Sequence, residues 1–210
     1  MKQTSLFAIT ISRQLGSGGA YVGQQLADKL TIFYADREII RNAAKQLSVM
    51  EEDIDFREER APSFWQNIFQ STSFFPDITI PESPIIPTDR ELFDAETDVI
   101  QHIAKEHSAV FIGRCGYFVL REHQNLVRIF LYGDPKVRIQ RIHEQYQVPE
   151  TVSEKMLLQS DKERALYNKT YTGKEWSDAK NYDLCINTSN VDLDKVVELI
   201  INYLKIRGII

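Results

Sequence analysis

The sequence has little cysteine, with only Cys115 and Cys185 in a chain of 210 residues. Two thiols are too few for a disulfide scaffold, and their spacing fits no zinc motif. No apolar run approaches the roughly 18 residues that would span a bilayer, and the first residues lack the apolar stretch of a signal peptide. Positive charge is also scarce, since 25 Lys and Arg face 30 Asp and Glu, for a net charge of -5. We therefore expect a cytoplasmic protein that binds neither nucleic acid polymers nor membranes.

Five short apolar runs alternate with helical patterns along the chain. The runs span residues 6–11, 32–35, 109–112, 127–132 and 183–187. Their continuous apolarity is typical of parallel strands that are covered on both faces. Between the runs, apolar residues recur at helical spacing, as at Val22, Leu26 and Leu30, and Asp36 is placed to cap the helix after the second run. The sequence predicts a three-layer α/β fold with a five-stranded parallel sheet.

Two segments break this alternation. Residues 62–87 hold five of the seven prolines and several aromatic residues, so they are too apolar for a disordered linker. We interpret them as an ordered flap or as a contact in a homo-oligomer. Residues 148–176 are polar and helical and end near Gly173. We expect a single domain, residues 1–210, with a core built from 1–36, 94–147 and 177–210 and insertions at 37–93 and 148–176.

The spacing of two Ser/Thr–Glu pairs predicts where helices begin. Ser48 with Glu51, and Thr151 with Glu154, have the spacing of a capping box. We expect one new helix at each of these two places.

A glycine-rich turn follows the first apolar run. Gly16, Gly18 and Gly19 precede a helix that starts at about Ala20. Such a turn exposes backbone N–H groups at the positive end of a helix, and these groups hold phosphate. A tight strand-to-helix turn and a dinucleotide loop remain alternatives, although the glycine spacing misses the dinucleotide fingerprint. A standard phosphate loop would place Lys at Gly19.

Because Lys is absent from the loop, another cation must face the terminal phosphates of a bound nucleotide. A transferred phosphoryl group is stabilised mainly by charge. The candidates are Arg13 in the loop, Arg138 and Arg141 on the helix after the fourth run, and Arg164 in the segment 148–176. The alternative for each is a solvated charge on a helix face.

These features together resemble the cytidylate kinase-like family, a divergent branch of the P-loop nucleoside monophosphate kinases. The resemblance runs from about residue 10 to 188 and is carried by residues 11–14, 16–19, 34–40, 112–115, 161–164, 171–174 and 182–188. It implies a P-loop NTPase fold in which 148–176 is a lid and 37–93 an acceptor-side insertion. It also implies ATP and Mg²⁺ as cofactors, with ATP held by Leu15, Gly16, Ser17, Gly18, Gly19 and Ala20.

The resemblance assigns roles to further residues. Gly113 and Arg114 match a Gly-Arg-Asp element that helps to hold the acceptor nucleotide, but Cys115 replaces the Asp. Asp36, Arg41 and Asp161 are the other implied acceptor-binding residues, with Arg41 one residue out of register. Arg138, Arg141 and Arg164 match arginines that lead into the lid or lie in it. Apart from the resemblance, the chemistry of phosphoryl transfer implies Mg²⁺ at the phosphates, and we expect Ser17 to substitute for the usual hydroxyl ligand.

Structural alternatives remain open for three of these residues: a buried ion pair for Arg114, a plain helix cap for Asp36, and a small apolar filler rather than a low-pKa thiol for Cys115.

The expected function is transfer of the γ-phosphoryl group of ATP to a small-molecule acceptor, a nucleoside monophosphate similar to CMP. Two alternatives stand beside it. The chain could be a nucleotide-binding regulatory module that has lost catalysis, which would account for the missing Lys. It could also be a kinase for a non-nucleotide acceptor.

Overall fold

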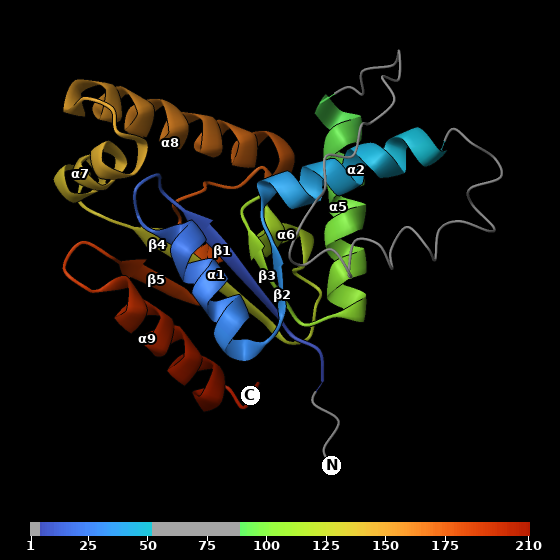
Figure 1. Cartoon of the computed structure of the whole chain (residues 1–210). Helices are drawn as coiled ribbons and strands as arrows, with labels where there is room; N and C mark the ends of the chain where they lie inside the picture. Colours follow the sequence, from blue (N-terminus) through green and yellow to red (C-terminus); the bar gives the residue numbers. More distant parts are fainter. Residues whose placement is uncertain (1–4, 52–88) are drawn as a thin grey trace.

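A five-stranded parallel sheet forms the centre of the molecule in the computed structural model, which describes residues 5–51 and 89–210 (Figure 1). The strands are β1 (Ala8–Arg13), β2 (Phe33–Ala35), β3 (Ala109–Ile112), β4 (Leu126–Tyr132) and β5 (Leu184–Asn187), in the order β2-β3-β1-β4-β5. The predicted three-layer α/β fold with five parallel strands is confirmed. Each observed strand overlaps its predicted apolar run.

The strand β1 lies at the centre of the sheet, and its register brings the carboxyl ends of the strands to one edge. Ala8 pairs with Ala109 of β3 and with Leu126 of β4. All the pairings are parallel. The residues that follow the strands therefore meet at one edge, which is where open α/β sheets bind ligands.

Helices cover both faces of the sheet. Their bounds are α1 (Gly19–Leu30), α2 (Arg37–Glu51), α5 (Asp89–Glu106), α6 (Gly116–Val119), α7 (Pro135–Tyr146), α8 (Glu150–Thr172) and α9 (Leu193–Ile206). Figure 1 shows α1 and α9 on one face and α2, α5 and α6 on the other. The helices α7 and α8 lie beyond the carboxyl edge of the sheet.

The apolar core is divided by the sheet into two main clusters. Ile9 and Ile11 of β1 pack with Val22 and Leu26 of α1 and with residues of α9. Ala8 belongs to the other cluster, which contains residues of α2 and α5. Burying a large aliphatic side chain stabilises the fold by about 1.5–3 kcal/mol, so these clusters fix the positions of the loops at the carboxyl edge.

The first capping prediction is wrong, and the second is right about the helix but wrong about its cap. The helix α2 runs without a break from Arg37 to Glu51, so no helix begins at Ser48. The helix α8 begins at Glu150, with Pro149 at its N-cap and no side-chain cap. Ser or Thr three residues before Glu is also the spacing of neighbours on one face of a continuous helix, so the pattern does not mark a helix start by itself.

The expectations about residues 62–87 lie outside the described part of the chain. No helix within that described part is long and apolar enough to cross a membrane.

Candidate active site

The glycine loop joins the central strand β1 to α1 at the carboxyl edge of the sheet. Gly16 and Gly18 have φ angles of 78° and 79°, a left-handed conformation that glycine adopts without strain. Gly18 is the N-cap of α1, and no side chain caps this helix. The first N–H groups of a helix have no intrahelical partner. The loop therefore presents uncapped donors at the positive end of a helix, as phosphate binding requires.

The side chain of Arg13 lies across two glycines. A Cβ atom at Gly19 would lie 2.8 Å from Cβ and 2.6 Å from Cγ of Arg13. A Cβ atom at Gly113 would collide with Nη1 of Arg13. Gly19 is not among the residues with positive φ, so the close approach of Arg13, rather than the backbone conformation, requires glycine there. Arg13 thus fills the space in which a lysine at position 19 would begin.

The guanidinium group of Arg13 is a desolvated cation. Burial, followed by the nearby charge of Arg164, lowers the pKa of Arg13 to about 9. Because this pKa is above neutrality, the group is charged at pH 7. A cation held away from water attracts an anion more strongly than one in solvent, so Arg13 is suited to contact a phosphate.

Two adjoining cavities lie beside Arg13. The first has a volume of about 290 Å³ and is lined by four guanidinium-bearing residues, Arg13, Arg37, Arg114 and Arg164. The second has a volume of about 370 Å³ and is lined by Arg13, Arg37, Asp36 and Arg41 among others. The structure therefore brings together five residues that the sequence predicted separately: Arg13, Arg114, Arg164, Asp36 and Arg41.

A more open cavity of about 770 Å³ lies elsewhere, and it is lined by residues such as Leu6 and Asn125 near the start of β1 and β4. It is at the opposite edge of the sheet from the glycine loop, so we do not assign it to this site.

Arg114 forms the buried ion pair that the sequence left open as an alternative. Its guanidinium group pairs with Glu96, whose side chain is 1% exposed, and lies 4.5 Å from the centre of the Tyr167 ring. Burial lowers the pKa of Arg114. Arg114 also lines the first cavity, so its ion pair with Glu96 leaves it in a position to contact a ligand there.

Cys115 is an apolar filler. It is 2% exposed, and burial raises the pKa of its thiol to about 12. Its sulfur lies 3.5 Å from Oδ1 of Asn168 on α8. The alternative of a low-pKa reactive thiol is therefore wrong.

Asp36 and Arg41 lie at the start of α2. The Oδ1 atom of Asp36 accepts hydrogen bonds from the N–H groups of Glu38 at 2.9 Å and Ile39 at 3.0 Å, so it caps the helix as predicted. The Nε atom of Arg41 is buried and has no hydrogen-bond partner among the described residues. Both side chains line the second cavity, where an anionic ligand would supply the missing acceptor.

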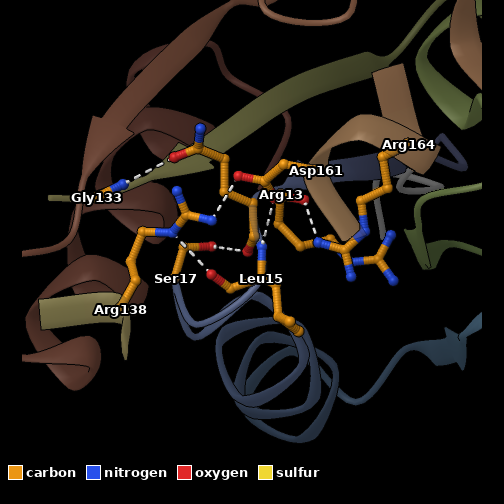
Figure 2. A network of polar contacts seen from close by, with 8 residues as sticks. Arg13, Leu15, Ser17, Gly133, Arg138, Asp161 and Arg164 are labelled. Atoms are coloured by element: carbon orange, nitrogen blue, oxygen red, sulfur yellow. Dashed lines mark hydrogen bonds and ion pairs between the residues drawn. The ribbon is translucent and has the colours of Figure 1, made fainter. Parts of the chain in front are cut away.

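Arg138 and Asp161 contact the backbone of the glycine loop rather than an open cavity (Figure 2). The Nε atom of Arg138 donates to the carbonyl oxygen of Leu15 at 2.7 Å, and Nη2 donates to Asp161 at 2.6 Å. The amide of Leu15 donates to Oδ1 of Asp161 at 3.1 Å. Arg138 is only 2% exposed. The structure therefore does not place these two side chains with the cavity-lining arginines.

Arg141 and Arg164 also donate to backbone oxygens near the loop. Arg141 donates to the hydroxyl of Thr188 at 3.1 Å and to its carbonyl oxygen at 2.8 Å. Arg164 donates to the carbonyl oxygen of Arg13 at 2.8 Å (Figure 2), and it lines the first cavity as well. Of this pair, only Arg164 is placed to face a ligand there.

The described residues do not fit a protein-held Mg²⁺ ion. The hydroxyl of Ser17 is buried and donates to the carbonyl oxygen of Gln14 at 2.8 Å. Ala20, which follows the position of the absent lysine, has no hydroxyl group. No group of three or more His, Cys, Asp or Glu side chains in the described residues is arranged to hold a metal ion. We therefore do not assign Ser17 as a metal ligand.

The sequence analysis missed Arg37 as a functional residue. It is the first residue of α2 and lines both cavities. Its place two residues after β2 was the available signal, because cations that follow parallel strands collect at the ligand-binding edge.

Solved structures, a shikimate kinase among them, share this fold. A protein from Eubacterium ventriosum ATCC 27560, described as uncharacterized, has a TM-score of 0.72 at 24% identity, over 95% of this chain and 98% of that one. A shikimate kinase from Bacteroides thetaiotaomicron has a TM-score of 0.53 at 12% identity, over 96% and 99%. The fold predicted from the sequence, that of P-loop kinases, is confirmed.

Curated relatives match part of the chain. A cytidylate kinase of Saccharolobus islandicus is 28% identical over 110 residues, which make up 51% of this chain and 57% of the relative. The chain therefore spans little more than half the length of the curated relatives it matches. The profile of the cytidylate kinase-like family matches residues 8–190, a range that includes the glycine loop and every cavity-lining arginine. On this match, the chain belongs to the cytidylate kinase-like family.

Proposed function

We propose that this protein is an ATP-dependent phosphotransferase whose acceptor is a nucleoside monophosphate similar to CMP. The observation that carries the proposal is the position of Arg13. Its stem fills the space of a side chain at Gly19, and its guanidinium group reaches Gly113 beside the cation-lined cavity. Arg13 thus supplies, from the first half of the loop, the positive charge that a standard phosphate loop draws from Lys.

The reaction needs positioning and charge more than covalent help from the protein. An oxygen of the acceptor phosphate attacks the γ-phosphorus of ATP, the bond from that phosphorus to the bridging oxygen breaks, and ADP leaves. The attacking oxygen is already anionic, so no general base is required. The proposal places the β-phosphate on the first turn of α1, with Arg13 and Arg164 stabilising the charge of the transferred group.

The acceptor occupies the two adjoining cavities. Arg37, Arg41 and Arg114 supply the positive charge there, and Asp36 supplies an acceptor of hydrogen bonds. The segment 148–176, which contains α8, acts as the lid that excludes water and so protects ATP from hydrolysis. The names of the curated relatives, cytidylate kinases, support a pyrimidine nucleotide as acceptor.

A coupled assay of ADP release tests the proposal. Full-length protein is incubated with ATP, Mg²⁺ and each nucleoside monophosphate in turn, with shikimate as a non-nucleotide acceptor. We expect turnover with CMP, and we expect Arg13→Ala to lower kcat by about a hundredfold or more, the usual loss when a donor to a developing charge is removed.

The other outcomes distinguish the alternatives. Binding of ATP without turnover on any acceptor contradicts the proposal and supports a regulatory module. Turnover with a non-nucleotide acceptor alone contradicts the nucleotide assignment. An unchanged kcat in Arg13→Ala contradicts the role given to Arg13.

A further inference from the structure

The residue Leu15 is held through both its amide and its carbonyl group. The two groups that hold it, Asp161 and Arg138, belong to different helices, α8 and α7. They also form an ion pair with each other at 2.6 Å. Figure 2 shows Arg138 reaching between Leu15 and Asp161. The ion pair and the peptide groups of Leu15 thus close a ring of hydrogen bonds, which we call the Leu15 clamp.

The surroundings of the clamp leave little freedom to the loop. Arg138 is 2% exposed, and its carbonyl oxygen lies 2.6 Å from the position of a Cβ atom at Gly16. Two residues after Leu15, the carbonyl oxygen of Ser17 accepts a hydrogen bond from Oγ1 of Thr188 at 3.0 Å. Charged groups that are buried together with their hydrogen-bond partners tolerate little change in geometry. The clamp therefore sets the path of the chain from β1 to α1.

We propose that Arg138 and Asp161 are positioning residues that hold the glycine loop in its nucleotide-binding shape. This inference rests on the proposed function for the identity of the ligand, the phosphates of ATP. The clamp acts on the loop through the backbone of Leu15. The donors of the first turn of α1, which begins four residues later at Gly19, are left for phosphate.

The clamp also links the loop to α8. Asp161 and Arg164 lie on one face of that helix, three residues apart, and both contact the first half of the loop, at Leu15 and Arg13. A change in the position of α8 is therefore transmitted to the residues that face the phosphates. Asp161, which the family resemblance assigned to the acceptor, is here assigned to the ATP side of the site.

A pair of matched substitutions tests the clamp. Asp161→Asn removes the negative charge that Arg138 needs. The control substitution is Asp183→Asn. Asp183 forms another partly buried ion pair, with Arg128, at an N–O distance of 2.8 Å. Asp183 directly precedes β5 and pairs with Arg128, near the start of β4, so this control lies away from the glycine loop.

Two measurements on the full-length protein are compared. The first is the dissociation constant of ATP by calorimetry, with that of CMP alongside. Hydrogen bonds to charged groups are strong enough that we expect Asp161→Asn to weaken ATP binding about tenfold or more. We expect the same substitution to change the dissociation constant of CMP less than about threefold. Asp183→Asn should lower the thermal stability about as much as Asp161→Asn does, but should leave the dissociation constants of ATP and CMP unchanged.

The second measurement is amide hydrogen exchange of the peptide that contains residues 13–19, without nucleotide. We expect faster exchange in Asp161→Asn and in Arg138→Lys. Arg138 reaches Leu15 and Asp161 from two separate nitrogens of a rigid, planar group, and lysine, with one nitrogen on a flexible stem, cannot reproduce that geometry. Asp183→Asn should leave this peptide unchanged.

The outcomes separate the clamp from the proposed function. Unchanged exchange in the loop of Asp161→Asn contradicts the clamp, whatever the protein binds. Faster exchange with equal losses of ATP and CMP affinity contradicts the positioning role. If the unmodified protein does not bind ATP while the loop still loosens in Asp161→Asn, the clamp stands and the proposed function fails.

Discussion

Arg13, Gly19 and Gly113 depend on one another. The side chain of Arg13 occupies the space in which a Cβ atom at position 19 or at position 113 would lie, so both positions need glycine. These three residues together place a cation beside a loop that has no lysine. The cation enters the site from the end of β1 instead of from the start of α1.

At the same scale, the two thiols should differ in reactivity. Burial raises the pKa of Cys115 to about 12, whereas Cys185 is exposed. Because the thiolate is the reactive form, we expect an alkylating reagent at about pH 8 to label Cys185 alone in the folded protein. Mass spectrometry of the digested protein gives the sites, and Cys185→Ser should remain unlabelled until urea is added. Labelling of native Cys115 at the rate of Cys185 would contradict its assignment as a core residue.

Arg114→Ala separates the two ends of the site. The guanidinium group of Arg114 lines the cavity assigned to the acceptor and pairs with Glu96. We expect KM for the acceptor to rise about tenfold or more, as for loss of a charged hydrogen bond, with KM for ATP changed less than about threefold. Steady-state kinetics with each substrate varied in turn measures both. Equal rises in the two constants would argue that Arg114 only supports the fold.

At the scale of elements, the glycine loop and the end of α8 use left-handed glycines for different reasons. Gly16 has a φ of 78° and lies under the carbonyl oxygen of Arg138. Gly173 has a φ of 69° with nothing within 4 Å of its Cβ position. We expect Gly173→Ala to cost about 1 kcal/mol of unfolding free energy, the cost of a left-handed residue alone, and to leave ATP binding intact.

Gly16→Ala has the same cost of a left-handed backbone and also places its Cβ atom against the carbonyl oxygen of Arg138. We expect a larger loss of unfolding free energy than for Gly173→Ala, together with weaker ATP binding. Urea unfolding and calorimetry measure the two quantities. Equal effects of the two substitutions would show that Arg138 does not fix the loop.

The pair of Arg128 and Asp183 gives β4 and β5 a dependence on pH. Burial alone would raise the pKa of Asp183, but hydrogen bonds from the side chain and backbone of Arg128 outweigh it and lower the pKa. The pair therefore stabilises the fold fully above the unfolded pKa of about 3.9 and loses this effect as the pH falls through the folded pKa. We expect Asp183→Asn to lose less stability than the unmodified protein between about pH 5 and pH 3 in urea titrations. Equal losses of unfolding free energy in the two proteins would contradict a stabilising role for the ionised carboxylate of Asp183.

The elements could be predicted where local pattern decides them. Apolar runs located the strands, Asp36 was recognised as a cap, and Gly173 as the end of α8. The start of α2 and the course of the glycine loop follow from the same local rules. The capping spacing at residue 48 marked no helix start, and the one at residue 151 lay beside a helix start but gave no cap, because identical spacings occur inside continuous helices.

The clamp could not be predicted, because its partners Leu15 and Asp161 are 146 residues apart. The sequence placed Arg138 and Arg141 on the helix after the fourth apolar run, but it did not show that their side chains donate to backbone oxygens in and near the loop. Arg114 illustrates the same limit. Its ion pair with Glu96 depends on how α5 packs against the end of β3, and no local pattern records that packing.

At the scale of the whole molecule, the net charge is -5, but the charge at one place is positive. Four arginines converge on one cavity at the carboxyl edge of the sheet, while the acidic excess is spread over the remainder of the chain. A protein with a net negative charge can therefore present concentrated positive charge at one edge of its sheet. The parallel sheet produces this focus, since it brings the ends of β1, β2 and β3 together.

The central claim is that Arg13 performs the task of the absent lysine. The direct test is to exchange the two positions and to measure kcat/KM for ATP with CMP as acceptor. Gly19→Lys alone places a side chain against Arg13, so we expect activity to fall. Arg13→Gly combined with Gly19→Lys restores the standard arrangement, and we expect it to recover most of the lost activity. Full activity in Gly19→Lys, or no recovery in the double variant while the fold is intact, would contradict the claim.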